Sequence, residues 1–183
     1  MTEPRSLRAD ARRNRDAIVA AARAAFDDDE QFRFDDFAAR AGVGVGTLYR
    51  HFPTREALAA AVYQGEVTAL CDRARDSLQS PGENLNLFLR GFVDYVVEHA
   101  GLARTLAAVV APAVQSDGGS QLEDTVATLM TRAVADGAIR HDVAAGAVMV
   151  VLHGIGSATD RPDWASESRA AVELLIAGLA NVA

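Results

Sequence analysis

The sequence predicts an all-α protein of about nine helices, in which a small N-terminal three-helix domain precedes a larger helical domain. Alanine, the residue with the highest helix propensity, is abundant, whereas only 5 of the 183 residues are proline. Most glycines lie at breaks between apolar stretches, and within these stretches apolar residues recur at the three- and four-residue spacing of one helix face. Runs of β-branched residues are short, which favours helices over strands.

The composition indicates the compartment in which the protein works. The single cysteine, Cys71, excludes an internal disulfide and a cysteine zinc site, and it fits a reducing compartment. The N-terminus lacks the apolar core of a signal peptide. The longest uncharged run, residues 143–159, is shorter than the roughly 20 apolar residues that span a bilayer. We therefore expect a cytoplasmic protein with no membrane partner.

The net charge of −7 is unevenly distributed. Residues 1–63 contain ten Arg and ten Asp or Glu, whereas residues 64–183 contain eight Arg and fifteen Asp or Glu. Between Arg5 and Arg23 there are six Arg and two Asp. Because salt limits the reach of exposed charges to about 10 Å, a positive face in the first part is compatible with an acidic second part. The overall charge does not exclude a nucleic acid as partner.

Residues 1–8 are expected to form a mobile arm that carries Arg5 and Arg8. The arm is either a solvated terminus or a segment that follows a phosphate backbone or enters the minor groove, as basic arms before helix-turn-helix units do. A first helix is predicted over residues 10–27, with core-facing positions at Ile18, Ala22, Ala25 and Phe26.

Residues 37–58 predict a helix, a tight turn and a second helix. Gly42 can adopt the left-handed conformation that ends the first of these helices. In the second, over residues 45–52, Leu48 and Phe52 share one face, and small, hydroxyl, aromatic and basic side chains cover the other. A helix that is buried on one side only suits a helix-turn-helix whose second helix enters the major groove of DNA.

The stretch AGVGVGTLYRHFPTREAL, residues 41–58, resembles the DNA-binding signature of the TetR family of transcriptional repressors. Its signature positions include Gly42, Thr47, Tyr49, Phe52 and Glu56. The resemblance extends back through residues 11–26 and so covers about the first third of the chain. It implies a helix-turn-helix DNA-binding domain in residues 1–63 and a helical ligand-binding and dimerisation domain in residues 64–183.

The loop before this motif departs from the family pattern. Most relatives have a glycine followed by a Ser or Thr N-cap, whereas residues 27–37 read DDDEQFRFDDF, with Arg33 at the expected cap position. We expect Asp35 and Asp36 to cap the second helix instead. The aromatic residues expected to fill the small core are Phe32, Phe34 and Phe37.

Eight residues are expected to face DNA. By resemblance, those at 45, 46, 47 and 49 meet bases or the adjacent backbone, and His51 and Arg55 contact phosphates. Arg50 can reach a phosphate and, less readily, a base. Two alternatives stay open: Tyr49 could instead pack against the junction of the third and fourth helices, and His51 could be an exposed cap. The set is Val45, Gly46, Thr47, Tyr49, Arg50, His51, Thr54 and Arg55.

A long fourth helix is predicted from about Thr54, its N-cap, to Gln79. Gly65 within it is either a hinge or a point of close packing. Five further helices follow, and breaks at 80–82, Pro112, 117–119 and Gly137 help to separate them.

The second domain has no catalytic pattern. It lacks a Gly-rich phosphate loop, a serine elbow, a cysteine nucleophile pattern and a metal motif, so we predict no enzyme, no cofactor and no metal. An aromatic and aliphatic stripe could line a ligand pocket, and a plain packed core is the alternative. The candidate pocket residues are Phe88, Phe92, Tyr95, His99, Met130, Met149 and His153.

The resemblance implies a homodimeric repressor that binds a palindromic DNA operator and is released by an unknown small-molecule effector. The last two helices are the expected dimer interface, through Val148, Val151, Leu152, Val172, Leu175, Ile176 and Leu179. A DNA-binding regulator without an inducer, constitutive or controlled by a partner, is the main alternative. A helical enzyme or a module that does not bind DNA would require a cluster of titratable groups, which the sequence lacks.

Overall fold

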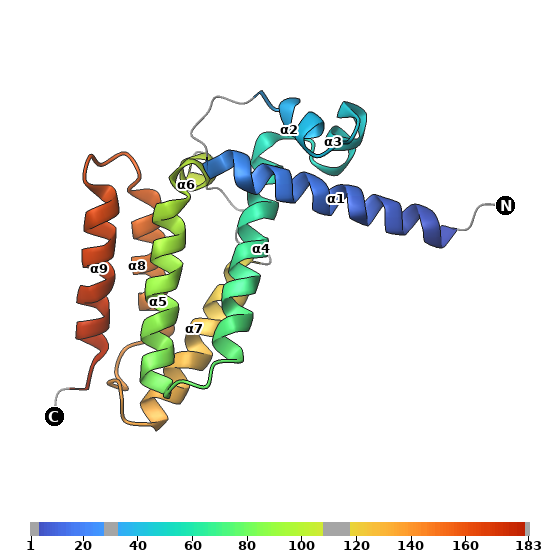
Figure 1. Ribbon diagram of the computed structural model, residues 1–183. Coiled ribbons are helices and arrows are strands. Elements are labelled where there is room, and N and C mark those ends of the chain that lie inside the picture. Colours follow the sequence, from blue (N-terminus) through green and yellow to red (C-terminus); the bar gives the residue numbers. More distant parts are fainter. Residues whose placement is uncertain (1–3, 28–32, 108–117, 182–183) are drawn as a thin grey trace. The chain divides into compact units, whose positions relative to one another are not determined.

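The computed structural model describes residues 4–27, 33–107 and 118–181, and over these residues the chain forms nine α-helices and no strand (Figure 1). The prediction of an all-α fold with about nine helices is confirmed. The helices are α1 (Pro4–Asp27), α2 (Asp36–Arg40), α3 (Val45–His51), α4 (Arg55–Arg75), α5 (Pro81–Glu98), α6 (Ala100–Ala107), α7 (Gly118–Ala135), α8 (Ala145–Ser157) and α9 (Trp164–Leu179).

The chain divides into two compact units, Met1–Tyr63 (unit 1) and Gln64–Ala183 (unit 2). In unit 1, α1, α2 and α3 pack against one another. Phe37 and Leu48 are completely buried there, and Phe52 is 3% exposed, as the apolar spacing predicts. The core of unit 1 consists of Ile18, Ala22, Ala25, Phe26, Phe37, Ala38, Leu48, Phe52, Leu58, Ala59 and Val62.

Helix α1 begins at Pro4 rather than near Asp10. Proline suits the first helical position, where its missing N–H has no intrahelical partner, and the Arg, Leu and Ala residues that follow favour helix. Residues 4–8, which we expected to belong to a mobile arm, are therefore helical. Residues 1–3 lie outside the described residues.

The start of α2 also differs from the prediction. Asp35 is the N-cap residue, but its side chain makes no capping hydrogen bond. The carboxylate of Asp36, the first helical residue, instead accepts a hydrogen bond from the backbone N–H of Arg33 at 2.9 Å. The structure thus shows no side-chain cap at the start of α2: Asp36 fixes the backbone before the helix, and the Asp35 side chain is left for another contact.

Gly42 ends α2 in the left-handed conformation, with φ of +66°. The N–H of Val43 bonds to the carbonyl of Ala38 at 3.0 Å, and the N–H of Gly42 to that of Ala39 at 3.1 Å. This pair of hydrogen bonds is a Schellman motif, in which the left-handed residue is usually glycine. The motif sets the direction in which the chain leaves α2 and enters α3.

Replacing Gly42 with alanine should lower the free energy of unfolding by roughly 1 to 2 kcal/mol, because a Cβ disfavours the left-handed conformation by that amount. Gly46→Ala is a suitable control, since Gly46 lies inside α3 and an added Cβ meets nothing within 4 Å. It should be neutral or stabilising. Urea denaturation of both variants would measure the difference, and equal stabilities would contradict the role of the turn.

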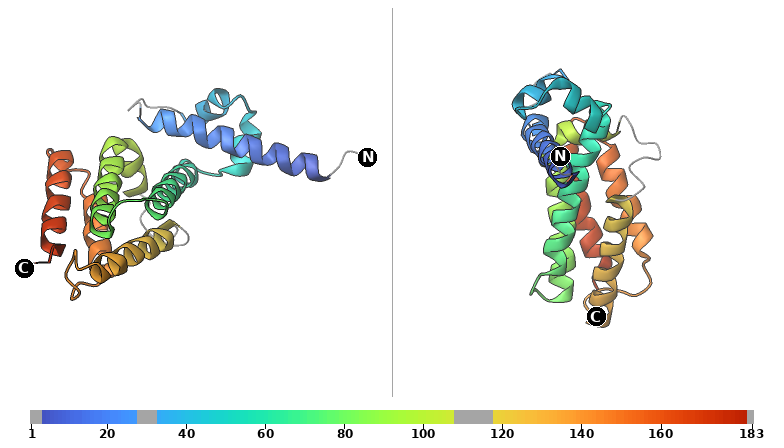
Figure 2. Two further views of the ribbon diagram at one scale, coloured as in Figure 1. Left: turned by 60° about the horizontal axis from the view of Figure 1, so that its bottom comes forward. Right: turned by 90° about the vertical axis from the view of Figure 1, so that its right-hand side faces the viewer.

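Unit 2 is a helical bundle. Helix α5 packs against α7 and α9, and α8 packs against α6, α7 and α9. The part of α4 that belongs to this unit is tied to its neighbours by side chains: the buried Asn84 amide donates to the carbonyl of Ala74 at 2.8 Å, and Thr68 donates to Gln121 at 2.9 Å. Helices α5, α7, α8 and α9 lie side by side in two views (Figures 1 and 2).

Two close contacts fix the ends of helices in unit 2. Residues 80–82, which we expected only to break the chain, contain the start of α5, with Pro81 at its first position. A Cβ on Gly82 would lie 2.6 Å from that of Ala138, so only glycine fits there. The buried Trp164 indole donates to the Ile155 carbonyl at 2.7 Å and joins α9 to the last turn of α8.

None of the helices in the described part of the chain combines the length and the apolar character needed to cross a bilayer.

Candidate functional site

Helix α3 presents a mixed surface to solvent because its apolar face is used in the core. Leu48 is completely buried, whereas Val45 is 45% exposed and Tyr49 is 46% exposed. Gly46 and Arg50 are also exposed, and Thr47 is half-buried. The four residues that we expected to meet bases, Val45, Gly46, Thr47 and Tyr49, therefore all lie at least partly outside the core of unit 1.

Tyr49 is held by two residues that precede α2. Its ring packs edge-to-face on the ring of Phe34, with centroids 5.2 Å apart and an interplanar angle of 81°. A side-chain hydrogen bond with Asp35, helped by partial desolvation, raises the pKa of the Tyr49 phenol. Tyr49 thus packs against the segment before α2. Sequence reasoning missed both partners.

Arg55 stacks on the aromatic core of unit 1. Its guanidinium carbon lies 5.2 Å from the ring centroid of Phe26 and 5.4 Å from that of Phe37. A cation over aromatic rings is attracted by their quadrupoles, so the position of the Arg55 head is restrained. Arg15 of α1 lies in the same way 5.4 Å from the ring centroid of Phe52, a second stacked arginine that the sequence analysis did not single out.

The remaining predicted contacts lie at the end of α3 and the start of α4. His51 is half-buried, and its Nε2 atom is buried without a hydrogen-bond partner among the described residues. Thr54 is exposed and its hydroxyl accepts a hydrogen bond from the backbone N–H of Ala57 at 3.2 Å, so its expected N-cap role is confirmed. All eight predicted DNA-facing residues belong to α3, α4 and the short turn between them.

The groups on this surface suit different parts of a nucleic acid. A hydroxyl, a phenol and guanidinium groups can hydrogen-bond to phosphates, and the methyl groups of Val45 and Thr47 can contact thymine. Val45 and Gly46 leave room for the axis of α3 to approach base edges. The arrangement has the groups that backbone contacts and apolar base contacts require.

The residues of the predicted ligand pocket all lie in unit 2, on α5, α7 and α8 or at their ends. Four of them, Phe88, Phe92, Met130 and Met149, are 3 to 5% exposed and form part of its core. The Tyr95 and His99 rings lie 4.4 Å apart, and Nδ1 of His99 is 2.9 Å from the Tyr95 carbonyl. Nδ1 of His153 is similarly 2.8 Å from the carbonyl of Met149.

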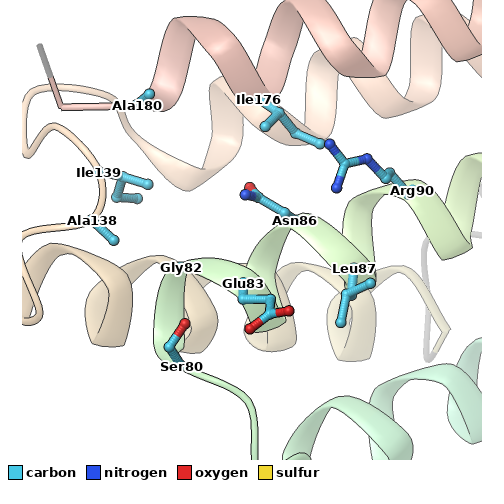
Figure 3. A pocket seen from close by; sticks show the side chains of 10 residues that line it. All are labelled: Ser80, Gly82, Glu83, Asn86, Leu87, Arg90, Ala138, Ile139, Ile176 and Ala180. Carbon is cyan, nitrogen blue, oxygen red and sulfur yellow. The ribbon is translucent and has the colours of Figure 1, made fainter.

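A pocket of about 370 Å³ lies elsewhere in unit 2, between the first turns of α5 and the end of α9 (Figure 3). The Asn86 amide points into the space between these helices. The Arg90 guanidinium at its edge is already engaged by Glu173, at 2.6 and 2.8 Å. The lining consists of Ser80, Gly82, Glu83, Asn86, Leu87, Arg90, Ala138, Ile139, Ile176 and Ala180. It includes no residue of the predicted ligand pocket.

Four of the seven residues that we expected at a dimer interface are instead inside the core of unit 2. They are 0 to 2% exposed, which leaves them no surface for a partner: Val148, Leu152, Val172 and Leu179. Val151, Leu175 and Ile176 are half-buried. The large apolar side chains that α8 and α9 expose are Val150, at 72%, and Leu174, at 75%. Because α8 is apolar on all sides, sequence periodicity could not separate its core face from its outer face.

Within the described residues, no three His, Cys, Asp or Glu side chains are arranged to hold a metal ion.

Two family models match the chain. The model for bacterial regulatory proteins of the tetR family matches residues 18–62, and the model for the C-terminal domain of SbtR-like transcriptional regulators matches residues 80–181. No curated protein matches.

Solved structures of transcriptional regulators are similar over nearly the whole chain. A TetR regulator from Streptomyces coelicolor is 37% identical, with 92% of this chain and 99% of that chain covered and a TM-score of 0.67. A TetR regulator from Mycobacterium vanbaalenii is 30% identical, with coverages of 96% and 99% and a TM-score of 0.67. One from Pectobacterium atrosepticum, 21% identical, shares the fold with a TM-score of 0.71 and coverages of 96% and 98%. TetR-family regulators are DNA-binding transcription factors and not enzymes. The extent of these matches shows that the chain belongs to the TetR family of transcriptional regulators.

Proposed function

We propose that the protein is a repressor that binds a palindromic operator as a homodimer and is released from DNA by a small molecule. The observation that carries the proposal is the orientation of α3. Leu48 lies in the core of unit 1, while Val45 and Tyr49 on the same helix are each almost half exposed. A helix held in this way after a tight turn can enter the major groove. Because its target is DNA, we place the protein in the cytoplasm.

Homodimerisation would follow from the symmetry of the operator. Two recognition helices about 34 Å apart can read successive major grooves on one side of the duplex, which a two-fold dimer provides. We propose that α8 and α9 form the interface around Val150 and Leu174, the exposed apolar residues of these helices. Gly146, Gly154 and Gly178 lie on the same helices, and added Cβ atoms there would meet nothing within 4 Å. These positions leave room for a partner helix to approach.

The effector would bind in unit 2. Solved structures with the same fold include FadR from Bacillus subtilis in complex with stearoyl-CoA and a gamma-butyrolactone receptor. The predicted site around Phe88, Phe92 and Met149 is apolar, and methionine adapts readily to the shape of a ligand. Release of DNA requires that the effector prefer one of two conformations, a coupling of about 1 to 3 kcal/mol.

Selection of DNA by the purified protein from a random duplex library tests this function. We expect the enriched sequences to be palindromes whose half-sites are about one helical turn, or roughly 10 base pairs, apart. Binding of the enriched duplex should weaken steeply as salt rises, because phosphate contacts release counterions. Enrichment of sequences without two-fold symmetry, or none at all, would contradict the proposal.

Replacing Tyr49 with alanine should weaken binding of the selected operator by roughly 1 to 3 kcal/mol, which is about 5-fold to 150-fold. The side chain is almost half exposed, so the variant should remain folded. Fluorescence anisotropy with labelled operator measures the loss, and circular dichroism checks the fold. Leu78→Ala, at a fully exposed residue of unit 2, is the matched control. A Tyr49 variant that binds as tightly as the control would exclude Tyr49 from the interface.

A further inference from the structure

We infer that Phe34, a residue outside the helix-turn-helix, is a positioning residue for DNA recognition that acts by fixing the ring of Tyr49 on α3. The inference rests on the proposed DNA-binding function and adds a residue that does not itself need to touch DNA. It follows from the aromatic contacts of unit 1.

Phe34 connects the exposed Tyr49 to the core. On one side its ring packs edge-to-face on Tyr49, with centroids 5.2 Å apart. On the other side it meets the completely buried ring of Phe37 at 6.1 Å and an angle of 67°, and Phe37 in turn lies 5.5 Å from Phe26. The aromatic series Tyr49–Phe34–Phe37–Phe26 therefore runs from the proposed DNA-facing surface into the interior of unit 1.

This arrangement restrains Tyr49 without covering it. The side chain remains 46% exposed, so one side of the ring is supported by Phe34 while the rest is available to a ligand. The carboxylate of Asp35, the neighbour of Phe34, raises the pKa of the Tyr49 phenol from the same segment. Phe34 is followed directly by Asp35 and Asp36. The Asp36 carboxylate fixes the backbone here, because it accepts a hydrogen bond from the backbone N–H of Arg33. The ring of Tyr49 is thus held by a short segment whose own backbone is fixed.

A side chain that is ordered before binding loses less conformational entropy when DNA binds. If Phe34 were removed, Tyr49 would sample other rotamers on a helix surface, and each complex would have to select the productive one. Aromatic pairs and the ordering of one side chain each contribute an amount that corresponds to about 2-fold to 10-fold in affinity. We expect the effect of Phe34 on operator binding to fall in this range.

A double-mutant cycle on the full-length protein distinguishes this role from a purely structural one. Phe34→Leu keeps an apolar side chain but removes the aromatic ring, and its effect on operator affinity is measured in three backgrounds: Tyr49, Tyr49→Phe and Tyr49→Ala. We expect a loss of about 2-fold to 10-fold with Tyr49 and with Tyr49→Phe, both of which keep the ring, and no loss with Tyr49→Ala. Phe34→Tyr, which restores an aromatic ring, should restore affinity.

The same loss in all three backgrounds would mean that Phe34 supports the fold alone, and no loss in any of them would mean that the ring contact is irrelevant to binding. Either result overturns the inference. The proposed function is tested separately, because it fails if the wild-type protein selects no palindromic duplex. Binding is measured well below the unfolding temperature of each variant, with the folded fraction checked by circular dichroism.

Discussion

Replacing Val150 and Leu174 together with aspartate should convert the protein into a monomer and weaken operator binding by about 100-fold or more. The two side chains are 72% and 75% exposed in the protomer, and a face formed by α8 and α9 would bury them. Each substitution removes roughly 1.5 to 3 kcal/mol of burial energy per subunit from the dimer interface, and the new carboxylates would be desolvated there. Binding through one half-site instead of two forfeits an avidity of about 10²-fold to 10⁴-fold.

Sedimentation velocity measures the oligomeric state, and anisotropy with the selected operator measures binding. Because both residues are exposed, the monomer should keep its fold, which the fluorescence of Trp164 reports from its buried place in unit 2. Leu78→Asp introduces a charge at a fully exposed leucine and should change neither property. If the double variant sediments as a dimer at micromolar concentration, the subunits meet through another surface.

The two faces of α8 show where sequence reasoning reaches its limit. A periodic pattern reveals a helix face only when the opposite face is polar, and residues 147–152 of α8 are all apolar. The helix was therefore predicted correctly, but which of its residues point inward was not. Val148 and Leu152 are completely or almost completely buried, while Val150 between them is exposed. Only the packing of α8 against α6, α7 and α9 distinguishes these positions.

The recognition helix α3 was predictable because the residues that determine it are close together in the sequence. Gly42, the apolar pair Leu48 and Phe52, and Pro53 lie within twelve consecutive residues, and together they determine the turn, the buried face and the end of α3. The partners of Tyr49 are fifteen and fourteen residues earlier in the chain, in a loop that departs from the family pattern. Contacts of this kind depend on how α2 packs on α3, which no spacing rule supplies.

The aromatic residues just before and within α2, Phe32, Phe34 and Phe37, show the same division between local and long-range information. All three were predicted to fill the small core of unit 1, and Phe37 does so with no exposed surface. Phe34 is only half-buried and faces both the core and Tyr49. Phe32 lies outside the described residues. The stacking of Arg55 on Phe26 and Phe37 was likewise not foreseen, since an arginine at the start of a helix is usually expected to be solvated.

Replacing Phe37 with alanine should unfold unit 1 at conditions where unit 2 remains folded. A buried Phe→Ala substitution costs about 3 to 5 kcal/mol, because burial energy is lost and a cavity remains. A domain of about 60 residues has a stability of only about 3 to 9 kcal/mol, so the loss is a large part of the total. Phe37 also contacts Phe34 and supports Arg55, so operator binding should be lost in parallel.

The single tryptophan makes the two units separately observable. Trp164 belongs to unit 2, so its fluorescence in a urea titration should report the same midpoint in Phe37→Ala as in the wild type, while circular dichroism at 222 nm shows an additional loss of helix at lower urea. Phe37→Leu leaves most of the volume filled, so its unit 1 should unfold at a urea concentration between those of Phe37→Ala and the wild type. A single transition in which both signals shift together would instead show that α4, which begins in unit 1 and ends in unit 2, couples their unfolding into one cooperative step.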